Sequence, residues 1–150
     1  RVGYSVWPDN LVKISERLNI NSFSCTNAPA QYGALAALEG PQECVKIMTS
    51  AFDRRRKLIF EEVNKLNGFK CNISKGAFYS MPSIEGTGLN SDKIENILLN
   101  KLGITTVSGK SFGVFGEGYI RLSYASSDEN IKKAMYRIKE FIETVGWHNA

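Results

Sequence analysis

The sequence predicts an α/β protein whose first part is helical and whose second part is an α+β lobe with antiparallel strands. Three observations carry this prediction. Up to residue 66, apolar side chains recur at the three-and-four spacing of amphipathic helices. Beyond Gly68 the pattern changes to the alternation that is typical of half-buried strands. From Ser126 onward an apolar stripe at helical spacing returns and predicts a closing helix.

Two short helices are expected first. Apolar residues between Asp9 and Leu18 predict an amphipathic helix that ends before the polar Asn19. An alanine-rich helix follows, with Pro29 in its first turn and Gly40 at its end. The small side chains of this second helix indicate close packing against another element.

A third helix is predicted to start at Pro41 and to continue until Gly68 ends it. At 1.5 Å per residue it would extend on the order of 40 Å, which exceeds the need of one small domain. We therefore expect this helix to bridge two lobes. The domain boundary is placed within it, so that residues 1–55 and 56–150 belong to different domains.

The second part contains four predicted strands. Residues 69–73 alternate apolar and polar side chains, and residues 77–81 form a strand that Pro82 stops, so these two are expected to pair antiparallel. Residues 104–107 and 119–124 are the next strands, separated by a glycine-rich loop.

Two helices accompany these strands. Ser91 is expected to cap the first, which Gly103 ends. Ser126 and Glu129 form a capping-box pattern in front of the closing helix, which ends at Gly146.

Composition indicates a folded, water-soluble chain. The 150 residues are 43% hydrophobic and 23% charged, as in ordinary globular proteins. No apolar run reaches the roughly 18 residues that cross a bilayer, and no leader-like segment opens the sequence, so no membrane partner is expected. Three widely spaced cysteines without a C-x-x-C pair favour a reducing, cytoplasmic setting.

A net charge of +4 and a pI near 9.0 raise the question whether the protein binds nucleic acid. The densest basic run is 54–57, and acidic residues flank it on the predicted long helix. Mixed charges of this kind favour a solvated helix face over a nucleic-acid footprint. A binding module that uses this basic helix to contact an acidic partner stays open as an alternative.

Few residues could carry catalysis by themselves. The single histidine, His148, and the dispersed cysteines give neither a metal site nor a Ser-His-Asp arrangement. The loop 108–113 lacks the residue order of a P-loop and is expected to be a glycine-rich strand connection. The reactive groups of any catalysed reaction must therefore come from elsewhere. Core packing is expected for the aromatic residues beside turns and strand ends: Tyr4, Tyr32, Phe78 and Tyr79.

Arg121 is the candidate binding residue, because it interrupts an apolar alternating run. Its side chain shares one face of the predicted strand with Tyr119 and Ser123, while apolar side chains occupy the other face. The planar guanidinium is suited to grip a carboxylate through two parallel hydrogen bonds. An internal salt bridge or an exposed arginine on an edge strand is the alternative that the strand pattern leaves open.

Six short segments, spread in order over nearly the whole chain, carry recognisable motifs. They are R-V-G-Y at 1–4, N-A-P-A-Q-Y at 27–32, F-D-R-R-R at 52–56, K-G-A-F-Y at 75–79, S-G-K-S-F-G at 108–113 and R-L-S-Y-A at 121–125. Together they resemble the carboxy-terminal part of class I pyridoxal-phosphate (PLP) aminotransferases of the aspartate aminotransferase type. The resemblance implies the fold-type-I PLP-transferase architecture, with residues 1–55 finishing the large PLP-binding domain and 56–150 forming most of the small domain.

The resemblance also implies a function. It implies transfer of an amino group between an aspartate-like amino acid and a 2-oxo acid by a homodimer that uses PLP. By motif, Arg1 would bind the cofactor phosphate and Arg121 would hold the substrate α-carboxylate. The family's Schiff-base lysine lies a few residues before Arg1, so we expect this chain to be part of a larger protein, to hold no catalytic residue and to be inactive alone.

The sequence departs from the family pattern in a few places. The loop 21–24 holds nothing basic, where some members carry an arginine for a second substrate carboxylate. Ser108 replaces a proline of the family's loop motif. Asn27 either caps a helix or lies near the cofactor of a partner subunit. A PLP-dependent lyase or synthase on the same scaffold stays open as an alternative activity.

Overall fold

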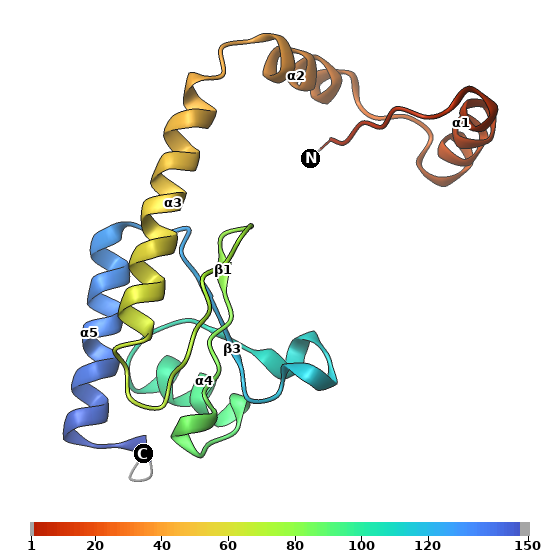
Figure 1. Ribbon diagram of the computed structural model, residues 1–150. Helices are drawn as coiled ribbons and strands as arrows, with labels where there is room; N and C mark the ends of the chain where they lie inside the picture. The colour runs from red at the N-terminus through yellow and green to blue at the C-terminus, as the bar shows by residue number, and fades with distance from the viewer. Residues whose placement is uncertain (1, 148–150) are drawn as a thin grey trace. The chain divides into compact units, whose positions relative to one another are not determined.

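The computed structural model describes residues 2–147, which divide into two units, one up to Val45 and one from Lys46 (Figure 1). Within this part of the chain no helix is long and apolar enough to cross a membrane. The helices are α1 (Asp9–Phe23), α2 (Ala28–Glu39), α3 (Glu43–Val63), α4 (Ser91–Asn100) and α5 (Asp128–Thr144), and the strands are β1 (Tyr79–Ser80), β2 (Val107–Ser108) and β3 (Ile120–Ser123).

The first helix runs past its predicted end. We expected it to stop before Asn19, but α1 continues to Phe23. The side chain of Asn21 donates a hydrogen bond to the Arg17 carbonyl oxygen at 2.7 Å, so this polar residue is accommodated inside the helix. The helix ends at Ser24, which has a positive φ of 61° and whose amide donates to the Ile20 carbonyl oxygen at 3.2 Å.

The second helix agrees with its prediction at both ends. Pro29 lies in its first turn, and the Asn27 side chain accepts a hydrogen bond from the Ala30 amide at 2.9 Å. Asn27 is therefore a helix N-cap, as one of its two predicted roles requires. The cap at the other end is Gly40.

The first unit has no core of its own, because no residue from 2 to 45 is buried. Large apolar side chains such as Trp7, Phe23 and Leu38 are about half exposed or more. The close packing expected of the alanine-rich helix is therefore not found within residues 2–45. Helices this short gain most of their stability from packing an apolar face, and here those faces are uncovered.

We expect a polypeptide of residues 46–150 to unfold cooperatively, because it carries the whole buried core of the second unit. A polypeptide of residues 1–45 should show little helix in water, since isolated helices of this length are marginal. Circular dichroism of the two fragments during heating tests both statements. Stable, cooperative helix in the 1–45 fragment would contradict them.

The third helix is shorter than predicted, because it ends at Val63 rather than near Gly68. The Asn64 side chain accepts from the Cys71 amide at 3.0 Å and donates to the Cys71 carbonyl oxygen at 3.1 Å. These two hydrogen bonds stabilise a reversal of the chain directly after the end of α3. The division between the units falls in the first turn of α3, and the assignment of residues 1–55 and 56–150 to large and small domains stays a prediction.

The sheet is antiparallel, with the order β1-β3-β2 and β3 in the centre. The expected pairing of residues 69–73 with 77–81 is wrong, because β1 pairs with β3 instead. Lys70 forms only an isolated bridge with Ser83. An alternating pattern marks a half-buried segment but does not identify its partner.

The last two helices are capped one residue away from the predicted positions. Asn90, not Ser91, accepts from the amide three residues on in α4, and Ser127, not Ser126, does so in α5. Ser91 has another partner, since its amide and hydroxyl both donate to Glu117. The backbone conformation of the residue before each helix, extended in both cases, decides the cap.

The core of the second unit lies between β3 and the helices α3, α4 and α5. In Figure 1, α5 runs alongside the second half of α3. Burial of each aliphatic side chain stabilises the folded state by about 1.5–3 kcal/mol. This cluster is therefore the main source of stability of the second unit. Its members from these elements are Ile59, Val63, Ile94, Ile97, Leu98, Ile120, Leu122, Ile131, Met135, Ile138 and Phe141.

One carboxylate joins α3 to α5. Asp128, the first residue of α5, accepts from Arg54 Nε at 2.7 Å and from Arg55 Nε at 3.1 Å. The hydrogen bond from Arg54, followed by that from Arg55, lowers the pKa of Asp128 from 3.8 to about 2. Its place at a helix N-terminus also suits a negative charge.

We expect Asp128→Asn to lower the thermal unfolding midpoint at pH 7, because a neutral amide loses both ion pairs. The folded-state pKa lies below the unfolded value, so the stabilisation is present above about pH 4 and is lost as the pH falls toward about 2. The difference between wild type and variant should therefore close over that interval in thermal unfolding from pH 2 to 7. Glu129→Gln is the control, because Glu129 has no ion pair within residues 2–147. A difference that persists unchanged to pH 2 would argue against this role.

Candidate substrate-carboxylate site

Arg121 lies on the central strand and projects from the face opposite the core. Its neighbours Ile120 and Leu122 are buried, whereas Ser123 is exposed and Tyr119 is 36% exposed. The predicted division of the strand into two faces is therefore confirmed. Arg121 itself is half-buried.

Two aromatic rings hold the guanidinium. The Arg121 Cζ atom lies 4.4 Å from the ring centroid of Tyr79 and 5.2 Å from that of Phe112. Within residues 2–147 the Arg121 side chain has no hydrogen bond or ion pair. The alternatives of an internal salt bridge and of an exposed edge-strand arginine are both wrong, because β3 is central and the cation has no acidic partner in this part of the chain.

This arrangement leaves the guanidinium chemically available. Its five N–H donors point outward in the plane of the group. An aromatic ring attracts the cation through the negative charge on its face, so it holds the group without accepting those in-plane donors in the way that a carboxylate does. Arg121 can therefore bind an incoming carboxylate through two parallel hydrogen bonds.

A pocket of about 510 Å³ opens beside this face of the sheet. Tyr79 and Tyr119, which flank Arg121 on its face, both line it, together with Lys70 and Glu85. Arg121 itself does not line this pocket, so the pocket adjoins the candidate site only through these two tyrosines.

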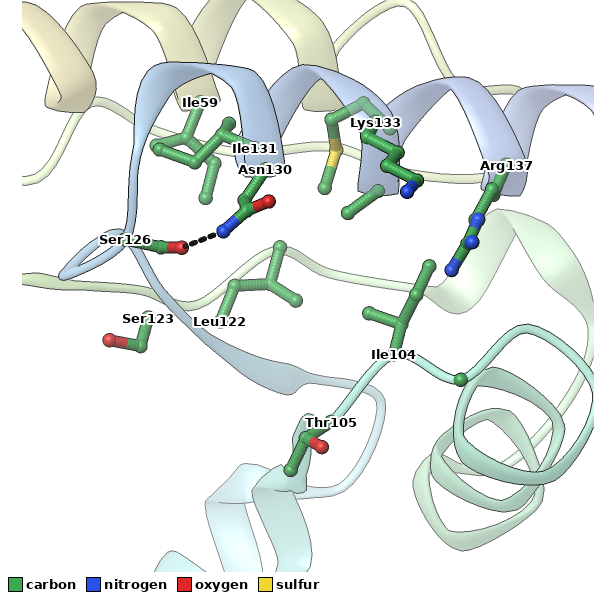
Figure 2. Close-up of a pocket in the computed structure, with 13 residues that line it drawn as sticks. Ile59, Ile104, Thr105, Leu122, Ser123, Ser126, Asn130, Ile131, Lys133 and Arg137 are labelled. Carbon is green, nitrogen blue, oxygen red and sulfur yellow. Dashed lines mark hydrogen bonds between the residues drawn. The ribbon is translucent and has the colours of Figure 1, made fainter.

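A second pocket, of about 360 Å³, is separate from this site (Figure 2). Asn130, Lys133 and Arg137 reach into it from α5, and Leu122 contributes to its apolar side. Arg121 does not line it.

The chain as a whole can be compared with known proteins. A family model described as "Aminotransferase class I and II" matches residues 1–138. The chain belongs to this family. The aspartate aminotransferase of Pyrococcus horikoshii is 34% identical over 145 residues, which cover 95% of this chain and 37% of that protein. The aspartate/prephenate aminotransferase of Cereibacter sphaeroides is 36% identical over 151 residues, with 94% and 37% covered.

Solved aminotransferases share the fold. The crystal structure of the aromatic aminotransferase from Pyrococcus horikoshii has a TM-score of 0.82 at 33% identity, and the match covers 91% of this chain and 37% of that one. The predicted fold-type-I architecture, an α/β protein with an antiparallel small-domain sheet, is confirmed. This aminotransferase chain spans about 37% of the length of these relatives.

A tightly built loop carries Phe112 and joins β2 to β3, as predicted for residues 108–113. Asp92 accepts from Ser108 Oγ at 2.7 Å and from Lys110 Nζ at 2.9 Å. The hydrogen bonds from Lys110 and Ser108, in that order, lower the pKa of the Asp92 carboxyl. The lysine of this glycine-rich loop is thus engaged by an acid of the chain itself.

The basic run on α3 is engaged in the same way. Each of its four cations pairs with a carboxylate of the second unit, so the run does not form the unpaired basic stripe that nucleic-acid binders present. The pairs are Arg54 and Arg55 with Asp128, and Arg56 and Lys57 with Asp53.

Several other predicted features have a different outcome. Arg1, the predicted phosphate-binding residue, lies outside the described residues. Tyr4 and Tyr32 are exposed and do not pack in a core, so that prediction is wrong for both. Within residues 2–147 no group of three His, Cys, Asp or Glu side chains is arranged to hold a metal ion.

Sequence reasoning missed the two residues that contact Arg121. The core packing predicted for Tyr79 is wrong, because this residue is half-buried and its ring contacts Arg121; for Phe112 the loop motif predicts no contact. The contact of Tyr79 could be predicted only if the pairing of β1 with β3 were known. That register places Tyr79 opposite Ser123, and hence on the same face as Arg121. No comparable rule predicts the contact of Phe112.

Gly109→Ala should destabilise the second unit by about 1–3 kcal/mol through overpacking. A Cβ at Gly109 would clash with the Gly116 carbonyl oxygen and would lie 2.7 Å from that of Tyr119, both of them backbone atoms. Gly76→Ala is the matched control, because a Cβ there meets nothing within 4 Å. Chemical unfolding of both variants checks the difference, and equal stabilities would refute the close approach.

Proposed function

We propose that the protein containing this chain is a PLP-dependent aminotransferase, in which Arg121 holds the α-carboxylate of the substrate. The amino donor is an aspartate-like amino acid and the acceptor is a 2-oxo acid. The observation that carries the proposal is the guanidinium of Arg121, which is half-buried, ringed by aromatic side chains and without an acidic partner in residues 2–147. Relatives with names such as aspartate aminotransferase support the reaction class.

Arg121 would act by orientation. A bidentate pair fixes both the distance and the rotation of the carboxylate, and therefore the direction of the bonds at the neighbouring α-carbon. Correct orientation of a bound reactant can supply a large part of a rate enhancement. The same contact rejects amines that lack a carboxylate, because they would leave a half-buried cation without its partner.

The cofactor would be bound largely by other residues. Arg1 would hold the phosphate of PLP, since a cationic fork suits a phosphate dianion. When bound, PLP supplies an electron sink for the negative charge that develops at the substrate α-carbon. No lysine lies in the family's Schiff-base motif in this sequence, and Lys110 of the β2-β3 loop is paired with Asp92. The chain would therefore contribute substrate binding rather than the proton-transfer group.

A preference for an aspartate-like substrate would require a residue that binds the second carboxylate of that substrate. The loop 21–24 offers no cation for it, so this contact would come from residues outside this chain. Relatives on this scaffold have names that include aspartate, prephenate and aromatic amino acids. A shared α-carboxylate and a variable side chain are what these names have in common, and Arg121 would serve the shared part.

We further propose a cytoplasmic homodimer. The uncovered apolar side chains of residues 2–45, among them Trp7 and Phe23, support contacts with further polypeptide. Cys25, Cys44 and Cys71 form no disulfide, which supports a reducing setting. The internal pairing of the basic run on α3 supports a protein without a nucleic-acid partner.

The test is kinetic and uses the full-length protein loaded with PLP. Arg121→Leu should lower kcat/KM for the amino acid on the order of a hundredfold or more, because a charged, hydrogen-bonded partner is removed. Arg137→Leu, on the separate pocket of Figure 2, is the matched control and should stay within about twofold.

Two further measurements sharpen this test. The 150-residue chain mixed with PLP should show no turnover, and analysis of the products should identify the 2-oxo acid and the new amino acid. Wild-type kinetics in Arg121→Leu would overturn the role of Arg121. Elimination or condensation products would favour a lyase or synthase instead.

A further inference from the structure

We propose that Tyr79 and Phe112 are positioning residues that hold Arg121 ready for a carboxylate without using its hydrogen-bond donors. This inference rests on the proposed role of Arg121 in binding the substrate. It adds two residues, from two different elements, to which neither the motifs nor the comparisons assign a function.

The strand register places Tyr79 where it must be. Tyr79 of β1 lies opposite Ser123 of β3, so its side chain is on the same face as Ser123 and Arg121. Arg121 is two positions from Ser123 along the strand, which makes it the diagonal neighbour of Tyr79. Diagonal pairs across antiparallel strands lie within reach of aromatic and long side chains, and the observed 4.4 Å from Cζ to the ring centroid agrees.

Phe112 reaches the guanidinium from the loop between β2 and β3. Its ring centroid lies 5.2 Å from the Arg121 Cζ atom. The loop is held at its base, since the Gly109 amide donates to the Tyr119 carbonyl oxygen at 2.9 Å and Asp92 binds both Ser108 and Lys110. Although the Phe112 residue is 54% exposed, its backbone is therefore fixed by contacts on either side.

Arg55 of α3 shows how a guanidinium held by a carboxylate differs from Arg121 of β3. Arg55 also lies over a ring, with its Cζ 5.9 Å from the centroid of Phe52, but its Nε donates to Asp128. A carboxylate immobilises a guanidinium by consuming the donors that a ligand needs. Aromatic faces restrict a long, flexible side chain and leave its in-plane N–H groups free. Arg121 is thus restrained yet available, whereas Arg55 is restrained and occupied.

The experiment uses the full-length protein with PLP and steady-state kinetics with an amino acid substrate. Tyr79→Leu and Phe112→Leu should each raise KM about tenfold, equivalent to about 1.4 kcal/mol, with kcat changed by less than about threefold because the orientation of a bound carboxylate is retained. Tyr79→Phe keeps the ring and should stay near wild type. Phe115→Leu is the control in the same loop, since Phe115 is 95% exposed and has no ring or cation contact among the described residues.

A double-mutant cycle separates positioning from a structural role. In an Arg121→Leu background, loss of either ring should raise KM no further, because no guanidinium is left to position. Ring variants that raise KM equally in both backgrounds would overturn the proposal, and so would unchanged KM values in the Arg121 background. If Arg121→Leu alone has wild-type kinetics, the proposed carboxylate role fails first, so the two failures are distinguishable.

Discussion

The structure of the second unit depends on the burial of one face of β3. Ile120 and Leu122 enter the core between the helices, and the two-residue period of a strand then obliges Arg121 to project from the other face. No separate interaction is needed to bring the cation out of the core. A shift of the strand by one residue would bury the guanidinium and expose two large aliphatic side chains, at a cost of several kcal/mol. The core therefore fixes the site.

Sequence alone could predict this much, because the pattern is local. The alternation around Arg121 and the extra positive charge within an apolar run are both visible in six consecutive residues. The helices α2 and α5 are also placed nearly correctly, since prolines, glycines and apolar spacing mark them. The alternating pattern could not predict which strands pair with each other. The contact between Tyr79 and Arg121 joins residues 42 positions apart, which no local rule predicts.

The errors at helix ends have a common cause. Asn21 in α1 and Asn64 after α3 both donate to the carbonyl oxygen four residues earlier, but only Asn64 also exchanges hydrogen bonds with the backbone of Cys71, where α3 ends. The same side chain can extend or terminate a helix, because its amide competes with the backbone for hydrogen bonds. Which of these occurs depends on whether another segment is near enough to offer its backbone groups. Tertiary structure, rather than propensity, therefore decided the outcome.

The distribution of charge explains why Arg121 is distinctive in this part of the fold. The dense basic run on α3 and the lysine of the β2-β3 loop are neutralised by acids of the same unit. The pairs of Arg54 and Arg55 with Asp128 connect α3 to α5, and that of Lys110 with Asp92 connects the loop to α4. The pairs of Arg56 and Lys57 with Asp53 lie within α3. Arg121 is instead contacted by two aromatic rings and keeps its hydrogen-bond donors free within residues 2–147. Contacts with aromatic rings alone provide the Arg121 guanidinium with no hydrogen-bond acceptor. An anionic ligand would provide the acceptors that residues 2–147 do not.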